Sequence, residues 1–259
     1  MADVQQIPDS ARTPDGAVVR RVLAFGAHPD DLDFGAAGTI AAWAAAGAEI
    51  HYGIMTDGDA GGFDPDQRDE IVATRRDEQR SAAARVGARE VHFLGYRDGY
   101  LEPSHEVRRD VVRLIRTVRP DVVLSMHPER NWASLHMSHP DHLACGEAVT
   151  RAVYPAAENP FAYPELADGG LGAYRVPWLW LYGAPEGRIN HTVDVTAHVE
   201  AKLEAIRVHL SQHSDFEATE RYVRARLLAT AASAGFAEGA SGEGFHVVAV
   251  NAKDTIAGF

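Results

Sequence analysis

Between residues 20 and 156, short apolar runs alternate with longer stretches that have helical periodicity, and this order strongly restricts the fold. The expected strands are 20–27, 48–56, 89–95 and 121–127, and the expected helices are 33–47, 68–87, 104–120 and 140–156. Because each helix can carry the chain back along the sheet, successive strands run in the same direction. The pattern therefore predicts an α/β fold, a Rossmann-like, open, mostly parallel sheet with helices on both faces.

The remainder of the chain is less regular. No internal repeat, low-complexity linker or shift of charge divides the sequence. After residue 156 we expect strands at 177–183, 191–195 and 244–251, and helices at 197–213 and 217–235. We therefore expect a flexible lead-in over 1–17 and a single domain over 18–259, with its core at 20–156 and a C-terminal α+β elaboration at 157–259.

The composition narrows the choice of partners. The chain has 25 Lys and Arg against 37 Asp and Glu, a net charge of −12. Such an excess of acid argues against a nucleic-acid surface, which needs basic patches, and against adhesion to anionic membranes. The single cysteine, Cys145, excludes an internal disulfide and favours a reducing compartment. With no signal-peptide pattern and no apolar run of membrane-spanning length, we expect a cytoplasmic protein with a small-molecule partner.

Two His-Pro-Asp motifs follow expected strands, "HPDD" at 28–31 and "HPDH" at 139–142. Because the carboxyl ends of parallel strands meet at one edge of a sheet, we expect the two motifs to lie close together. Two imidazoles and one carboxylate suit a hydrolytic zinc site with an open position. A further carboxylate can act as a base and a further histidine as an acid. Turn formation explains one such motif alone, but it does not explain both.

These residues resemble the LmbE-like / PIG-L family of metal-dependent N-acetylglucosaminyl (N-acetyl sugar) deacetylases. Members remove acetyl groups from N-acetylglucosamine-type amines, and some instead cleave amide-linked conjugates. The resemblance implies a zinc-dependent hydrolase that removes an acyl group, by expectation acetyl, from the amide nitrogen of an N-acetylglucosamine-type sugar or glycoside. It spans about residues 20–215 and rests on "AFGAHPDDLDFGAAGTIA" (24–41), "TRRDEQRSAAARVGAREVHFLGYRDGYL" (74–101), "SHPDH" (138–142) and "KLEAIRVHLSQ" (202–212).

Carried over by position, the resemblance implies that His28, Asp31 and His142 are the metal ligands. This donor set accepts Zn²⁺, and also Fe²⁺ or Mn²⁺. The resemblance further implies that Asp30 is the general base toward the attacking water. Neighbouring side chains point in different directions, so one aspartate can bind metal while the other meets the water.

The resemblance also implies roles for residues outside the ligand set. His139 would stabilise the oxyanion and protonate the departing amine, and Asp141 would orient His139. Arg75 and Asp98 match positions that contact the sugar in family members. The alternative for Arg75 is a solvent-exposed place on a charged helix, and the alternative for Asp98 is a turn.

One position departs from the family pattern. Some sugar deacetylases of the family carry a tyrosine two residues before the second motif, where this chain has Met137. The segment 129–137 lies where a lid over the substrate could sit. Two other functions stay open: an amidase acting on a larger thiol-sugar or antibiotic conjugate, and a non-catalytic sugar-binding protein. The resemblance is compatible with a homo-oligomer, but no stretch identifies an interface.

Several aromatic and histidine residues have no role that the sequence assigns. Trp178, Trp180 and Tyr182 alternate along one expected strand, which predicts core packing, with an aromatic wall for the substrate as the alternative. His127 fits the end of a strand, and for His209 we expect a structural role. The histidines inside strand-like runs, for which we expect packing in the core, are His51, His92 and His246.

Overall fold

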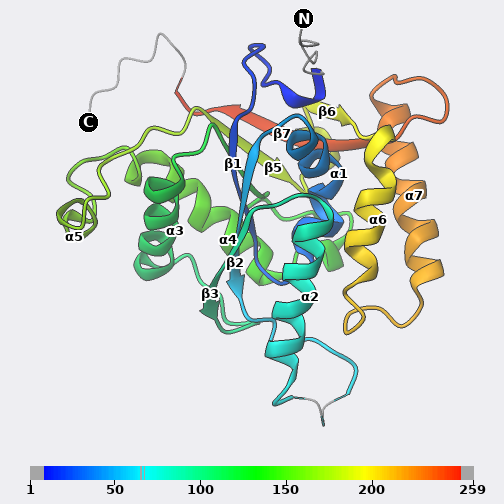
Figure 1. Cartoon of the computed structure of the whole chain (residues 1–259), viewed down its shortest axis with the longest axis horizontal. Coiled ribbons are helices and arrows are strands. Elements are labelled where there is room, and N and C mark those ends of the chain that lie inside the picture. Colours follow the sequence, from blue (N-terminus) through cyan, green and yellow to red (C-terminus); the bar gives the residue numbers. More distant parts are fainter. Residues whose placement is uncertain (1–8, 65, 67, 252–259) are drawn as a thin grey trace, which may run out of the picture.

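The computed structural model describes residues 9–251 except 65 and 67, and within them seven strands form one sheet in the order β3-β2-β1-β4-β5-β7-β6 (Figure 1). Strands β1 to β5 are parallel, whereas β7 runs antiparallel to both of its neighbours. This confirms the predicted α/β class. The strands are β1 (Arg21–Gly26), β2 (Glu49–Thr56), β3 (Glu90–Tyr96), β4 (Val122–Met126), β5 (Trp178–Tyr182), β6 (His191–Asp194) and β7 (Gly242–Ala249).

Helices cover both faces of the sheet. Helices α1, α2 and α6 pack together on one face, α3 and α4 lie on the other, and α7 packs against β7 (Figure 1). No helix in the described part of the chain is both long and apolar enough to cross a membrane. The helices are α1 (Asp31–Ala45), α2 (Ile71–Arg85), α3 (His105–Val118), α4 (Pro140–Arg151), α5 (Pro164–Asp168), α6 (Val199–Arg207) and α7 (Phe216–Ser233), with short turns η1 (Asp9–Ala11), η3 (Leu135–Met137), η4 (Ala152–Ala156), η5 (Glu186–Arg188) and η6 (Thr196–His198).

Local sequence signals explain where the helices begin and end. The Ser104 hydroxyl caps α3 by accepting a hydrogen bond from the Val107 amide at 3.2 Å. Arg119 then leaves the helix in a left-handed conformation with φ 53°, directly before Pro120. Helix α4 has Pro140 in its first turn, where a missing amide hydrogen costs nothing.

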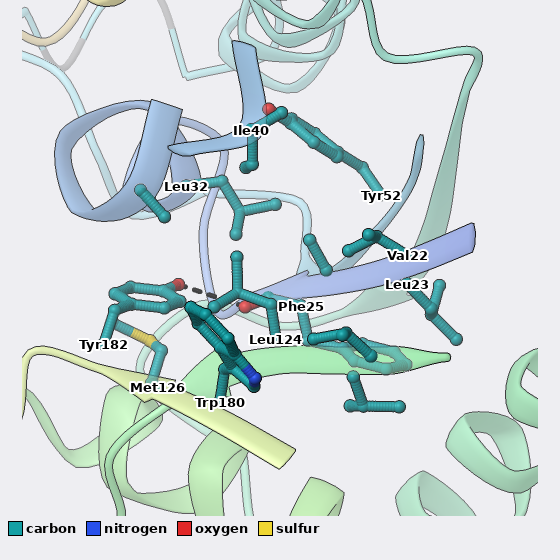
Figure 2. Close-up of a cluster of buried hydrophobic side chains, with 14 of the residues drawn as sticks. Val22, Leu23, Phe25, Leu32, Ile40, Tyr52, Leu124, Met126, Trp180 and Tyr182 are labelled. Carbon is teal, nitrogen blue, oxygen red and sulfur yellow. Dashed lines mark hydrogen bonds between the residues drawn. The ribbon is translucent and has the colours of Figure 1, made fainter. Parts of the chain in front are cut away.

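The core covers both faces of the sheet, and Figure 2 shows the part of it around β1, β4, β5 and the helix α1. Trp180 and Tyr182 are buried in it, and the Tyr182 hydroxyl donates to the backbone carbonyl of Phe25 at 3.0 Å. A Cβ atom at Gly35 would lie 2.3 Å from the Tyr182 ring, so α1 can approach β5 only because this residue is glycine. The aromatic wall considered for these residues is therefore wrong, because Trp180 and Tyr182 are core side chains.

The expected flexible lead-in differs from the structure in its described part. Residues 9–17 fold back against α1, with Ala11 fully buried. The indole Nε1 of Trp43 donates to the carbonyl of Ser10 at 2.9 Å, and Arg12 forms a bridge with Val18. Apolar burial, the Trp43–Ser10 hydrogen bond and the backbone hydrogen bonds around the Arg12–Val18 bridge thus hold this segment. Residues 1–8 lie outside the described residues.

Candidate metal and catalytic site

The two His-Pro-Asp motifs meet where the direction of sheet winding reverses. Strands β1 and β4 are neighbours, but the helix after β1 lies on one face of the sheet and the helix after β4 on the other. Such a switch point leaves a crevice beyond the strand ends, which is where ligands bind in α/β sheets. All the predicted site residues belong to one connected group here: His28, Asp30, Asp31, Arg75, Asp98, His139, Asp141 and His142.

The predicted metal ligands form a chain of close contacts. Nδ1 of His28 lies 3.4 Å from Asp31 Oδ2, and Nε2 of His142 lies 3.1 Å from Asp31 Oδ1. The backbone amide of His28 also donates to Asp31 Oδ2 at 2.7 Å, which fixes the carboxylate. Zinc bonds of about 2.0–2.2 Å place tetrahedral ligand atoms roughly 3.4 Å apart. The two distances from Asp31 to the histidine rings are therefore those of neighbouring ligands around a divalent cation.

The other ring nitrogen of His28 faces two more carboxylates. Its Nε2 lies 3.1 Å from Asp98 Oδ1 and 3.3 Å from Asp141 Oδ2. A histidine that binds a metal usually donates its second N–H to a carboxylate in this way. Burial alone would lower the pKa of His28, but hydrogen bonds to Asp141, Asp31 and Asp98 outweigh it and raise the pKa to about 12.

Four carboxylates gather around His28 at this edge of the sheet. One guanidinium, that of Arg75, is buried beside the aspartates and lies 3.3 Å from Asp30 and 3.9 Å from Asp98. Gathering carboxylates out of water is costly unless a cation compensates them. The donor types and the charge balance both fit a divalent cation held by this group, whose carboxylates are Asp30, Asp31, Asp98 and Asp141.

Asp30 has an unusual backbone. Its φ is 115°, a region that costs about 1–3 kcal/mol for a residue other than glycine. The Asp30 amide donates to Oε1 of Gln79 at 2.8 Å, and its carboxylate meets Arg75. Burial and the neighbouring charge of Asp31 raise the pKa of Asp30 to about 6, against the opposing charge of Arg75. A carboxylate with a pKa near neutrality is well matched to proton transfer at physiological pH.

Gln79 was not predicted as part of the site. Its Nε2 donates to Asp33 Oδ2 at 2.8 Å, and the same oxygen lies 2.8 Å from Nε2 of His209. A buried chain of hydrogen bonds thus runs from Asp30 to His209, which is a structural role for this histidine. Gln79 follows Arg75 by four residues on α2, so helical spacing is the one sequence signal that could have found it.

Arg75 is buried, so the alternative of a solvent-exposed place on a charged helix is wrong. Its guanidinium donates to the carbonyl of Pro29 at 2.7 Å and to the carbonyl of Gly58 at 3.0 Å. Gly58 has φ +64°, and a Cβ there would lie 2.6 Å from this guanidinium. Arg75 therefore joins the loop after β1 to the loop after β2.

The contacts of Asp141 differ from the prediction. Its carboxylate accepts from the backbone amides of Gly99 at 2.7 Å and Leu101 at 3.3 Å, and it faces His28. In the described part of the chain no hydrogen bond joins this carboxylate to the ring of His139. Instead Nδ1 of His139 accepts from the backbone amide of Asp141 at 3.2 Å. The neutral His139 ring therefore carries its hydrogen on Nε2.

The residues of the candidate site lie in the part of the chain that matches a known protein family. Residues 23–153, just over half of the chain, match the family described as PIG-L: GlcNAc-PI de-N-acetylase. Both His-Pro-Asp motifs lie inside this match. The chain belongs to the PIG-L family. The predicted family resemblance is thereby confirmed.

Relatives of this PIG-L chain include named deacetylases. It is 32% identical to diacetylchitobiose deacetylase of Thermococcus kodakarensis, over 80% of this chain and 76% of that protein. It is 32% identical to a probable N-acetyl-alpha-D-glucosaminyl L-malate deacetylase 2 of Bacillus anthracis, over 74% of this chain and 81% of that protein. Among solved structures, N,N'-diacetylchitobiose deacetylase from Pyrococcus horikoshii superposes with a TM-score of 0.81 at 33% identity, covering 89% of this chain and 84% of that one.

A groove opens beside the second motif of the PIG-L chain. It has a volume of about 1090 Å³ and begins at Met137, two residues before His139. Arg188 pairs with Glu129 at 2.7 Å and so ties the loop before β6 to segment 129–137. This volume is at the upper end of ligand pockets, which span roughly 300–1,000 Å³. Polar side chains on its walls include Asn131, Asn190, Thr192, Tyr222 and Arg226.

Proposed function

We propose that this PIG-L protein is a metal-dependent hydrolase that removes an acetyl group from the amide nitrogen of an N-acetylglucosamine-type sugar or glycoside. One observation carries the proposal: the close donor atoms of His28, Asp31 and His142 adjoin a further carboxylate, that of Asp30, which lies 3.3 Å from Arg75. The names of its relatives in Thermococcus and Bacillus support the same bond and the same class of sugar.

We propose that His28, Asp31 and His142 hold the cation and that the cation is zinc. Fe²⁺ and Mn²⁺ accept the same donors, so the identity of the metal rests on measurement. When bound, the cation supplies a Lewis acid that polarises the amide carbonyl and lowers the pKa of water. The contacts of Asp98 and Asp141 with Nε2 of His28 support an orienting role toward this ligand.

The protein's own groups would move the protons. Asp30 accepts a proton from the attacking water as its oxygen bonds to the amide carbon. His139 presents Nε2–H to the amide oxygen, where negative charge develops in the transition state. The carbon–nitrogen bond then breaks as His139 gives its Nε2 proton to the amine and acetate leaves, and His139 regains a proton from solvent while Asp30 releases the one that it took from water. Arg75 holds Asp30 in place, and contacts of Arg75 and Asp98 with the sugar stay predictions.

Free-amine release from a panel of acetylated substrates tests the proposal. The panel comprises N-acetylglucosamine, its inositol and malate glycosides, diacetylchitobiose and an N-acetylated aminoglycoside fragment, each with zinc added back. We expect release by the native protein and a loss of about 10²–10⁴-fold in Asp30→Asn, with its metal retained. Normal turnover by Asp30→Asn would overturn the role of Asp30. No release from any amide by the zinc-loaded protein would overturn the hydrolase and favour a non-catalytic sugar-binding protein.

The groove favours a second candidate function, an amidase that acts on a larger conjugate. Its volume of about 1090 Å³ exceeds the needs of a single sugar ring, and its lining includes Met137, two residues before the second motif. A thiol-sugar or antibiotic conjugate would place its bulk along Asn190 and Tyr222. Comparison of kcat/KM for a minimal acetylated sugar and a bulky conjugate separates the two, because an amidase for conjugates loses most of its rate on the minimal substrate.

A further inference from the structure

A second group of metal-ligating side chains lies on the sheet away from the candidate active site. It consists of His51 on β2 and Glu90 and His92 on the edge strand β3. The strand register pairs His51 with Glu90, and His92 is two residues further along β3. The group lies five residues before the end of β2 at Thr56, roughly 16 Å away at about 3.3 Å per residue. It is therefore separate from the ligands proposed for catalysis.

The three donor atoms of this group form a compact triangle. Nδ1 of His51 lies 3.4 Å from Nε2 of His92 and 3.7 Å from Oε2 of Glu90. Nε2 of His92 lies 3.7 Å from the same oxygen. Ligands of a tetrahedral zinc ion lie roughly 3.4 Å apart, given bonds of about 2.0–2.2 Å. The triangle needs only a few tenths of an ångström of contraction to become one face of that tetrahedron.

The contact between Nε2 of His51 and Glu49 determines which ring nitrogen faces His92 and Glu90. The Nε2 atom lies 2.9 Å from Oε1 of Glu49, and a carboxylate can only accept, so this nitrogen carries the hydrogen. Nδ1 is then unprotonated in the neutral ring, and its lone pair is directed at His92 and Glu90. A metal-binding histidine typically holds a carboxylate with its other nitrogen in this manner.

Charge and access also fit a cation. Among the described residues Glu90 has no Lys or Arg within 4.0 Å, and its ion-pair partners are the two imidazoles. Neighbouring guanidinium groups, from Arg21 and Arg89, lie against Glu49 instead. The Glu90 side chain is 56% exposed, which leaves the triangle open to solvent.

We propose that His51, Glu90 and His92 form a second divalent-cation site of the zinc type, with solvent completing the coordination. The bound ion would cross-link the edge strand β3 to β2. Binding to the folded state alone raises stability with metal concentration. This inference goes beyond the proposed deacetylase and does not depend on it.

Zinc stoichiometry tests the second site. Metal-free protein is dialysed against Zn²⁺ and its bound zinc is measured by mass spectrometry, for the native chain, His92→Asn and Glu90→Gln. Both substituted side chains lie on the edge strand β3, where that of Glu90 is 56% exposed and that of His92 is 22% exposed, and Asn keeps a polar side chain at position 92. We expect each variant to lose one ion per chain. The matched control is His105→Asn, an exposed histidine on α3, which should keep the native stoichiometry.

A second background separates this proposal from the catalytic one. His142→Ala removes a proposed catalytic ligand, so we expect it to retain one ion and to lose that ion when His92→Asn is added. Retention of zinc by both single variants would overturn the second site, as would the absence of bound zinc in His142→Ala. The latter result would mean that the two imidazoles only share a proton.

Hydrogen exchange tests the second site independently of zinc stoichiometry. Zinc should slow exchange of the backbone amides of β2 and β3 in the native protein, because the ion would join the two strands. In His92→Asn the same concentration of zinc should leave these amides unchanged. Equal slowing in both proteins would contradict binding at this group.

Discussion

The sheet carries two histidine–carboxylate groups that share one local arrangement. Nε2 of His28 contacts the carboxylates of Asp98 and Asp141, and Nδ1 of the same ring lies 3.4 Å from Asp31. Nε2 of His51 contacts the carboxylate of Glu49, and Nδ1 of the same ring lies 3.7 Å from Glu90. In both, a carboxylate behind the ring determines which nitrogen is free to bind a metal. The two groups differ in the structure that holds the carboxylates.

The group around His28 lies where strands end and loops begin. There backbone amides fix Asp141, and the loop places Asp30 at φ 115° as a candidate base beside the ligands. The group around His51 lies within a regular strand pair, whose amides are used by the ladder. Side chains there can bind an ion, but the neighbouring carboxylate of Glu49 contacts the back of His51 and pairs with Arg21 and Arg89. The comparison teaches that loops at strand ends can support catalysis, whereas a strand pair supplies ligands alone.

The largest expected effect is on activity when a catalytic ligand is removed. His142→Ala should lose its catalytic metal and reduce kcat/KM by about 10³-fold or more, since metal polarisation is worth several kcal/mol and each 1.4 kcal/mol is tenfold. Deacetylation rates and metal content of the same sample measure this. Retained activity in the variant would contradict the difference between the two groups. The group at the strand ends would then have no catalytic role, like the group on β2 and β3.

A matched pair of substitutions compares how the two groups hold carboxylates. In metal-free protein, Asp141→Asn should cost about 3 kcal/mol of unfolding free energy, because its amide hydrogens would face the Gly99 or Leu101 amide within a buried cluster. Glu90→Gln should cost less than about 0.5 kcal/mol, because that side chain is exposed. Urea unfolding at pH 7 gives both values, and equal losses would contradict the difference in support.

The smallest expected effect is on the pH dependence of the unfolding free energy. It arises from the buried contact between Asp33 and His209, which lies behind Asp30 in the group around His28. Burial tends to lower the pKa of His209, but its hydrogen bond to Asp33 and the charge of Asp33 raise the pKa above its ordinary value of 6.5. The folded state therefore holds this proton more tightly than the unfolded state. The resulting stability is fully present below pH 6.5 and is lost as pH rises through the folded-state pKa.

Unfolding free energy at pH 6 and pH 9 measures this contribution. The native protein should lose about 1 kcal/mol more than His209→Gln over this range, the usual net scale of a hydrogen bond. An identical pH dependence in the two proteins would mean that the Asp33–His209 contact is not an ion pair. Such a result would mean that packing and neutral hydrogen bonds hold Asp30 in position.

Much of the site could be predicted from local patterns. Apolar runs and helical periodicity predicted the strands and helices, and both motifs followed strands whose carboxyl ends share an edge. Other features depended on partners far away in sequence. Gln79 looks ordinary on its helix, and Arg75 looks solvent-exposed until Pro29 and Gly58 meet it. His51 and His92 fit a core strand, and only the register of β2 and β3 opposes His51 to Glu90.

The sequence by itself determined the fold class and the edge of the sheet that carries the motifs, because periodicity, helix caps and right-handed crossovers are local or general rules. Only the tertiary structure decided which carboxylate serves which histidine. Asp141 lies two residues from His139, yet its side chain contacts His28, 113 positions away. Hydrogen bonds require donor and acceptor within about 3 Å and in line, and such distances are set by the packing of whole elements rather than by neighbours along the chain.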